Sequence, residues 1–126
     1  MPARDHREFF PVDMENGWER IPGYPDGFAR LTLADSLDPA NLRGRSTRII
    51  RIEAGTVLPR AVVHDTCEEV FLYQGDLVVG CDENGTGGEV FNAPTFAIRP
   101  EQVMHGPFSS RTGCLMFELH YFNDAR

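Results

Sequence analysis

Three residues of this sequence have the types and spacing of a metal site, namely His64, Glu68 and His105. His64 and Glu68 lie four residues apart, and on an extended strand such side chains point to the same side because side chains alternate with a period of two. An imidazole and a carboxylate that are buried together need a partner, either a metal ion or each other. His105 comes from a distant segment, and a Gly-Pro turn after it fixes its direction. The sequence therefore predicts a divalent-metal site at these three residues.

A fourth residue, His120, is a candidate for catalysis in the last apolar segment. It shares a strand face with Glu118, whereas Leu115, Phe117 and Leu119 make up the apolar face of the same segment. Two interpretations follow. His120 is either a proton carrier at the mouth of the cavity or, as its place on the polar face favours, a surface histidine.

Arg60 is the second catalytic candidate. It has the same strand parity as His64, so it either reaches an anionic substrate or lies exposed at the rim of the barrel. Apolar and aromatic residues near these positions are candidates for a substrate pocket, although in strands such residues are more often plain core. The predicted pocket residues are Val62, Tyr73, Phe96 and Met104.

The composition limits the class of protein. A length of 126 residues with 41% apolar residues provides one hydrophobic core, so we expect one domain. A net charge of −7 argues against nucleic acid or an anionic membrane as partner, because proteins that bind either one need a surplus of Lys and Arg. Neither a membrane-length apolar run nor a secretory signal is present, and three widely spaced cysteines indicate reduced thiols. We expect a cytoplasmic protein that binds a small molecule or another copy of itself.

Short segments that end at Gly or Pro predict an all-β fold. An irregular arm and a loop are expected over residues 1–44, with a short edge strand at 9–12 and a weak strand at 28–33. A barrel is expected over residues 45–126, with a hairpin that reverses at Gly75-Asp76. The predicted barrel strands cover residues 45–53, 68–74, 77–81, 89–91, 95–99 and 114–121.

Two segments resemble the motifs of the cupin superfamily. Residues 55–76 are similar to the first motif, in which a Gly precedes His-x-His, a Glu and a second Gly, and Pro100–His105 is similar to the second, Pro-x-Gly-x-x-His. Within the superfamily the chain is most similar to ChrR-like cupins, which include acetylacetone dioxygenase-type enzymes. The resemblance implies a small cupin barrel of the double-stranded β-helix, jelly-roll-like type with an N-terminal arm.

The chain departs from these motifs at two positions. Val62 stands where the first motif has its first His, and Gln102 stands where the second motif has Gly. Cupins with the full set bind metal through three His and one Glu, and those of the acetylacetone dioxygenase type use three His. The resemblance therefore leaves His64, Glu68 and His105 as ligands, and two imidazoles with one carboxylate suit non-haem Fe(II) with open coordination positions.

The resemblance implies a metal-dependent oxygenase. The expected enzyme is a non-haem Fe(II) dioxygenase that uses dioxygen to cleave a C–C bond of a small chelating diketone or hydroxyketone. One alternative is a non-redox lyase, isomerase or hydrolase that uses Zn(II), Mn(II) or Ni(II) to polarise a carbonyl. Others are a regulatory cupin that binds metal or ligand without catalysis, and a barrel that has lost its metal. A homodimer is expected because an open barrel has edge strands and an arm with Phe9, Phe10 and Trp18 has little reason to fold alone.

Overall fold

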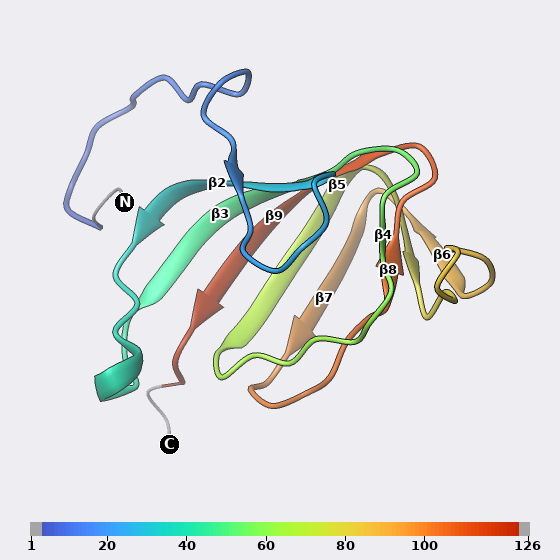
Figure 1. Cartoon of the computed structure of the whole chain (residues 1–126). Coiled ribbons are helices and arrows are strands. Elements are labelled where there is room, and N and C mark those ends of the chain that lie inside the picture. Colours follow the sequence, from blue (N-terminus) through green and yellow to red (C-terminus); the bar gives the residue numbers. More distant parts are fainter. Residues whose placement is uncertain (1–3, 124–126) are drawn as a thin grey trace.

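The computed structural model describes residues 4–123, and its strands form a curled sheet in the shape of a half-open barrel (Figure 1). The predicted all-β class is confirmed, since the described residues contain strands and one short 3-10 turn, η1, at Pro39–Asn41. None of their helical segments is long and apolar enough to cross a membrane. The strands are β1 (Glu19–Arg20), β2 (Phe28–Asp35), β3 (Arg45–Ile52), β4 (Val57–Leu58), β5 (Cys67–Val79), β6 (Glu89–Asn92), β7 (Thr95–Arg99), β8 (Phe108–Ser109) and β9 (Cys114–Tyr121).

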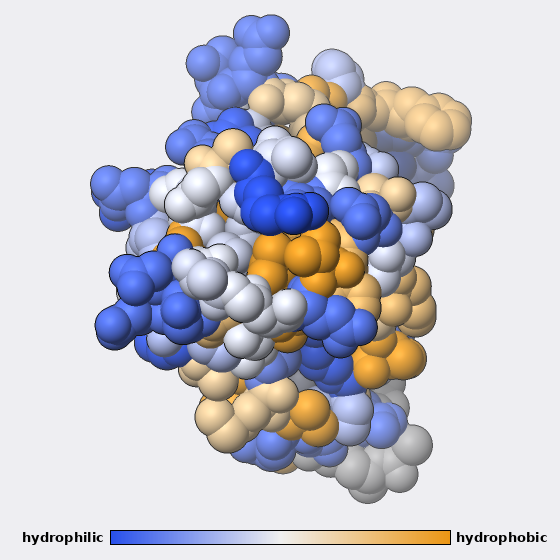
Figure 2. All heavy atoms as spheres, turned by 90° about the vertical axis from the view of Figure 1, so that its right-hand side faces the viewer, coloured by the Kyte–Doolittle hydropathy of each residue, from blue (hydrophilic) through white to orange (hydrophobic). Residues whose placement is uncertain are grey.

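Strand β5 belongs to both parts of the curled sheet. Its first half lies between β9 and β7 in the order β1-β2-β3-β9-β5, with β7 on the far side, and its second half pairs with β6 and β8. All of these pairings are antiparallel. The side that carries β4, β6 and β8 has a mixed surface with an apolar group at its centre (Figure 2). The chain therefore closes one end of the barrel by bending β5 into a second, smaller sheet.

The predicted hairpin at Gly75-Asp76 is wrong, because β5 continues through both residues to Val79. Gly75 has a φ of 84°, which L-residues with a side chain rarely adopt, and the β5–β9 register shifts between Leu72 and Gln74. A Cβ at position 75 would overlap the carbonyl oxygen of Gly113. The glycine thus allows β5 to bend where it lies close to the Gly113 backbone at the start of β9, and it does not reverse the chain.

The inner face of the sheet changes from polar to apolar along the strands. Cross-strand partners form three rows, which run from β7 or β5 towards β2. The polar row contains Arg99, Glu68, His120 and Ser46; the mixed row contains Val70, Glu118, Arg48 and Thr32; the third row contains Leu72, Met116, Ile50 and Arg30. The apolar end continues into the buried core around Phe28, Ile52, Leu58 and Leu77. Polar side chains therefore gather at one end of a cavity whose other end is hydrophobic.

The outer face of β7, β5 and β9 is apolar and exposed. Phe96, Phe71 and Phe117 are cross-strand partners in one row and expose 56%, 43% and 41% of their surface. The predicted faces of the last strand are therefore wrong, since the side of Phe117 points outward and that of Met116, Glu118 and His120 points inward. Strand period alone gives two faces but does not say which of them is inside.

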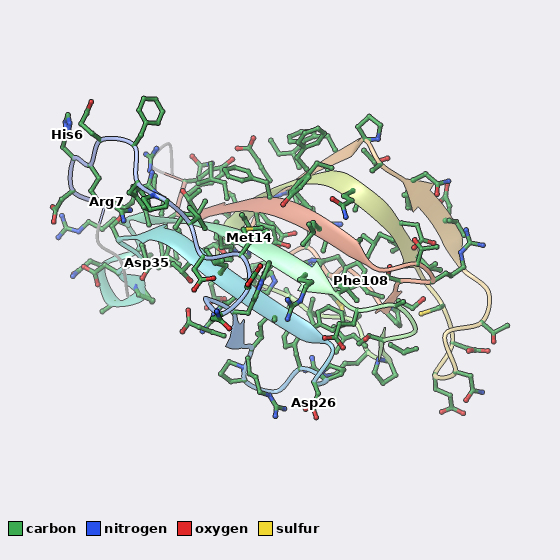
Figure 3. All side chains as sticks on the ribbon, turned by 90° about the horizontal axis from the view of Figure 1, so that it is seen from above. His6, Arg7, Met14, Asp26, Asp35 and Phe108 are labelled. Carbon is green, nitrogen blue, oxygen red and sulfur yellow. The ribbon has the colours of Figure 1, made fainter. Side chains whose placement is uncertain are left out.

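The segment before β2 runs along the outside of the barrel and then across its open side. Asp26 and Asp35 mark the two ends of β2, and His6 and Arg7 lie near the Asp35 end (Figure 3), where Arg7 Nη2 donates to the carbonyl oxygen of Leu33 at 2.5 Å. The expected edge strand at 9–12 is not formed. β2 falls inside the predicted 1–44 arm and loop, yet it pairs with β3 along its length, so the sheet begins before residue 45.

Candidate metal centre

Three histidines converge on one carboxylate oxygen in the concave cavity. The Nε2 atoms of His64, His105 and His120 lie 3.6, 3.9 and 3.0 Å from Oε2 of Glu68. The His64 ring centroid is 4.9 Å from that of His105 and 5.0 Å from that of His120. The candidate ligand atoms of His64, Glu68 and His120 all lie within 4.8 Å of one another. We call these four residues the His/Glu cluster.

Strand pairing explains how residues so far apart in sequence meet. Glu68 and His120 are Cα partners in the β5–β9 pair. The loops before β5 and after β7 are joined by a bridge in which the Val62 N–H donates to the His105 carbonyl at 2.7 Å and the His105 N–H donates to the Val62 carbonyl at 2.8 Å. This bridge places His64 beside His105, although residues 63–66 lie in a loop and not on the predicted strand.

The second nitrogens of two imidazoles fix the direction of the rings. His105 Nδ1 donates to the carbonyl oxygen of Val103 at 3.2 Å, and His120 Nδ1 lies 3.1 Å from the hydroxyl of Thr66. A hydrogen bond at Nδ1 orients an imidazole and leaves Nε2 for a ligand role. In both residues Nε2 therefore faces the cluster.

Two charged neighbours set the electrostatics of the cluster. Arg99 Nη1 donates to Oε1 of Glu68 at 2.6 Å, and His120 Nε2 lies 3.0 Å from Oε1 of Glu118. Burial favours the neutral acid at Glu68, but the hydrogen bond and charge of His120, together with the charge of Arg99, outweigh it and lower the Glu68 pKa. Burial also opposes protonation of His120, yet its hydrogen bonds to Glu118 and Glu68 raise the His120 pKa.

The other two imidazoles stay neutral at physiological pH. Burial, together with the charge on His120, lowers the pKa of His64 to about 4. Burial also lowers the pKa of His105, against the attraction of Glu68. Neutral imidazoles present a lone pair, so His64 and His105 are in the state that binds metal ions.

The cluster forms one wall of a cavity of ≈ 340 Å³. Val62, Phe108 and Met116 contribute apolar wall, and Arg30, Arg48 and Arg99 contribute positive charge. Phe108 lies well away from His6 and Arg7 of the arm, which are outside this cavity (Figure 3). Ile21 and Tyr24, which precede β2, line the cavity from the open side of the barrel.

The structure brings together most of the residues that the sequence predicted for the site. His64, Glu68 and His105 lie in the cluster, and Val62 lines the cavity. His120 is 5% exposed and lies against Glu68, so the surface position that its pattern favoured is wrong.

Four predicted residues lie elsewhere. Arg60 is exposed, and its Nη2 donates to the carbonyl oxygen of Gly23 at 2.6 Å while its guanidinium lies 5.4 Å from the centre of the Tyr24 ring. It therefore holds the segment before β2 and does not reach into the cavity. Tyr73 and Phe96 lie on the outer sheet face, because their strand parity is opposite to that of the inward Leu72 and Ala97. Met104 lies on a loop and is 68% exposed.

Sequence reasoning did not identify three arginines that line the cavity, Arg30, Arg48 and Arg99. It also did not identify Glu118 as a partner of His120 inside the cavity. Each alternates with apolar neighbours on a strand, which is also the pattern of an exposed charge. Only the knowledge of which strand face is inside distinguishes the two.

The donor set fits a divalent transition metal. Imidazole nitrogens with one carboxylate are ligands that suit Fe, Zn, Ni and Mn, whereas Ca²⁺ and Mg²⁺ prefer oxygen donors alone. Nε2 of three histidines and Oε2 of Glu68 point towards one another in a partly closed cavity. The arrangement therefore supports a possible His/Glu metal site, in which His120 supplies an imidazole that the sequence motifs do not include.

Comparisons with known proteins give the same fold. No family model matches the sequence, and no curated protein matches it. Among solved structures the chain is similar to an acetylacetone dioxygenase from Acinetobacter johnsonii, with a TM-score of 0.65 and 19% identity over 99% of this chain and 85% of the other. It is similar to KdgF from Halomonas sp., with a TM-score of 0.65 and 16% identity over 93% and 97% of the two chains. An RmlC-like cupin from Shewanella frigidimarina matches with a TM-score of 0.62 and 20% identity over 94% of each chain.

Proposed function

Because the chain has the cupin fold and its cavity brings three imidazoles to one carboxylate, we propose that the protein is a metal-dependent cupin enzyme. The observation that carries the proposal is the approach of three Nε2 atoms to within 3.0–3.9 Å of Glu68 Oε2. His64, Glu68 and His120 would hold a divalent ion, with His105 as a fourth donor. The ion would replace the proton on Nε2 of His120. In this proposal His120 supplies the imidazole that Val62 does not.

The finer proposal is a non-haem Fe(II) dioxygenase that cleaves a C–C bond of a small diketone or hydroxyketone. The fold that the chain shares with acetylacetone dioxygenases supports it, as does a nitrogen-rich donor set. Fe(II), when bound, supplies open coordination positions for a chelating substrate and redox capacity towards dioxygen.

The chain's own residues would bind and orient the reactants. Arg99 holds Glu68 as a carboxylate and fixes its rotamer through the 2.6 Å bond to Oε1. Thr66 and the Val103 carbonyl orient the rings of His120 and His105. The apolar wall at Val62, Phe108 and Met116 excludes water from the reacting groups.

The test is elemental analysis of protein purified without chelator, followed by oxygen uptake with Fe(II) restored and a panel of β-diketones and hydroxyketones. His64→Ala should lose both the metal and the oxygen uptake. His6→Ala is the matched control, because His6 is exposed and pairs with Glu8 far from the cluster.

The other readings give different results in the same test. Bound Zn(II), Mn(II) or Ni(II) without oxygen uptake would indicate a non-redox lyase, isomerase or hydrolase. Wild-type protein that binds no metal would overturn the metal-site proposal and favour a barrel that has lost its metal or binds only a small ligand.

A further inference from the structure

Two arginines line the cavity beside the His/Glu cluster, and among the described residues neither has a hydrogen-bond or ion-pair partner. Arg30 lies on β2 and Arg48 on the neighbouring β3, both on the inner face. We propose that they form a binding site for the carboxylate of the substrate, so that the substrate is a small anionic chelator such as a diketo acid. The idea that the substrate also chelates a metal rests on the proposed function. The anion site itself depends only on the two arginines.

The proposal depends on the burial of one guanidinium nitrogen, Nε, in each of these half-buried arginines. Nε of Arg30 and Nε of Arg48 are buried and have no hydrogen-bond partner. Among the described residues, neither side chain forms an ion pair, a side-chain hydrogen bond or a cation–π contact. A buried charge is costly unless it is paired, and a guanidinium matches a carboxylate through two parallel hydrogen bonds. Two such groups at one cavity wall therefore fit an anionic ligand.

Two other arginines, Arg99 of the cavity and Arg51 of the outer face, provide a comparison because each contacts a protein group. Arg99 pairs with Glu68. Arg51 also has a buried Nε without a hydrogen bond, but its guanidinium lies 4.4 Å from the centre of the Trp18 ring on the outer face. Each of these has a partner that explains its position, whereas Arg30 and Arg48 face the cavity.

The carboxylates of the cavity already have partners. Oε1 of Glu118 lies 3.0 Å from His120 Nε2, Oε1 of Glu68 accepts from Arg99, and Oδ1 of Asp65 accepts from Gln102 Nε2 at 2.7 Å. The charged residues lining the cavity are three arginines and three acids. A divalent ion in the His/Glu cluster would give the cavity a surplus of positive charge, and an anionic ligand would neutralise it.

Strand register places the arginine pair at a suitable position relative to the cluster. Arg48 is the Cα partner of Glu118, which is two residues from His120 on β9. Arg30 lies diagonally beyond Arg48, since its partner on β3 is Ile50. A carboxylate bound by the two arginines would thus leave the rest of a small molecule pointing along β9 towards Glu68 and His120.

The experiment compares two ligands that differ by one carboxylate. Acetylacetone is a neutral diketone, and acetopyruvate is the same diketone with a carboxylate in place of one methyl group. Their affinities are measured by calorimetry on Zn(II)-loaded protein, in which the metal has no redox capacity towards dioxygen, and on metal-free protein. Wild type should bind acetopyruvate at least about tenfold more tightly than acetylacetone, because charge-assisted bidentate hydrogen bonds have no counterpart in the neutral ligand.

Three variants decide the result. Arg30→Gln and Arg48→Gln should each lose most of this preference, while metal content and acetylacetone affinity stay unchanged. Arg51→Gln is the matched control on β3 and should keep the preference. Since neither cavity guanidinium group makes a hydrogen bond or an ion pair with the described residues, their replacement should change the melting temperature of the ligand-free protein little. If one variant still fails to fold, the other decides.

The outcomes separate this inference from the metal proposal. Equal affinity for both diketones in wild type, or a preference that survives both cavity variants, overturns the anion site even if the metal is bound. A preference for acetopyruvate that persists in metal-free protein and is lost in Arg48→Gln supports the anion site even if the protein never binds metal.

Discussion

His120 Nε2 lies 3.0 Å from Oε2 of Glu68, although 52 residues separate them in sequence. The two residues are direct partners in the β5–β9 pair, so the contact follows from strand register and not from a local motif. Nε2 of the same imidazole also approaches Glu118, and its Nδ1 approaches Thr66. A histidine so enclosed has the surroundings of a ligand and not those of a surface residue.

His120→Ala should reduce the affinity for a divalent metal by at least about tenfold, because a ligand is lost and even the loss of an outer partner of a ligand commonly costs that much. Thr66→Val should reduce it less, since the ring would keep Nε2 but lose the hydrogen bond at Nδ1. Both effects are measured by competition with a chromophoric chelator. Full metal affinity in His120→Ala would show that His64, Glu68 and His105 suffice.

The sequence identified most of this site because its residues occur in two short segments with clear spacing. His64 and Glu68 could be named from their types and their spacing of four, and His105 from its type and from the motif that Pro100–His105 resembles. His120 could not be assigned, because the apolar side chains Leu115 and Phe117 of β9 suggested that the opposite face was the exposed one. The apolar face is in fact the outer one, and the polar face lines a cavity that no single strand reveals.

The fold was predictable in class and in most strand positions, but less so in its connections. Turn residues at Gly75-Asp76 indicated a reversal, whereas the chain continues and changes sheet there. The same dipeptide can begin a hairpin or bend a long strand, and the pairing of Gly75 with β9 beside Gly113 distinguishes the two. Such tertiary contacts have no local signal.

Gly75→Ala should therefore destabilise the protein by about 2–4 kcal/mol, through the strain of positive φ and the overlap of the new Cβ with the Gly113 carbonyl. Gly80→Ala is the matched control, with a φ of 85° but nothing within 4 Å of the added Cβ. It should lower the free energy of unfolding by only about 1 kcal/mol, because it adds the strain of positive φ without an overlap. Urea denaturation measures both variants, and equal losses of unfolding free energy would contradict the effect of the close Gly113 carbonyl.

The outer row of Phe96, Phe71 and Phe117 predicts self-association. These three aromatic side chains form a contiguous exposed apolar face, and among the described residues β7 pairs only with β5, so its other edge is free. We expect a homodimer through this face, detected by light scattering as twice the mass of one chain. Phe71→Asp should weaken it, whereas Val90→Asp on β6 should not. A wild-type protein that remains monomeric at high concentration would contradict the prediction.

Asp76 should be a main determinant of acid stability, although it lies outside the cavity lining. This buried carboxylate accepts hydrogen bonds from the Ser110 hydroxyl at 3.0 Å, the Thr112 N–H at 3.0 Å and hydroxyl at 2.9 Å, and Arg111 Nε at 2.9 Å. Burial favours its neutral form, but these donors outweigh burial and hold the Asp76 pKa well below its usual range. They tie β5 to the loop before β9.

Because the pKa of Asp76 is lowered on folding, its stabilisation is complete above the unfolded value of about 3.9 and declines as the pH falls below it. At neutral pH, Asp76→Asn should lower the free energy of unfolding by about 3–5 kcal/mol, since the amide cannot satisfy all of these donors. The difference from wild type should shrink as the pH is lowered through 4. Asp26→Asn, which removes an exposed ion pair with Arg20, should have little effect at any pH. Chemical denaturation at several pH values measures all three proteins, and a pH-independent difference would show that shape, and not charge, makes Asp76 important.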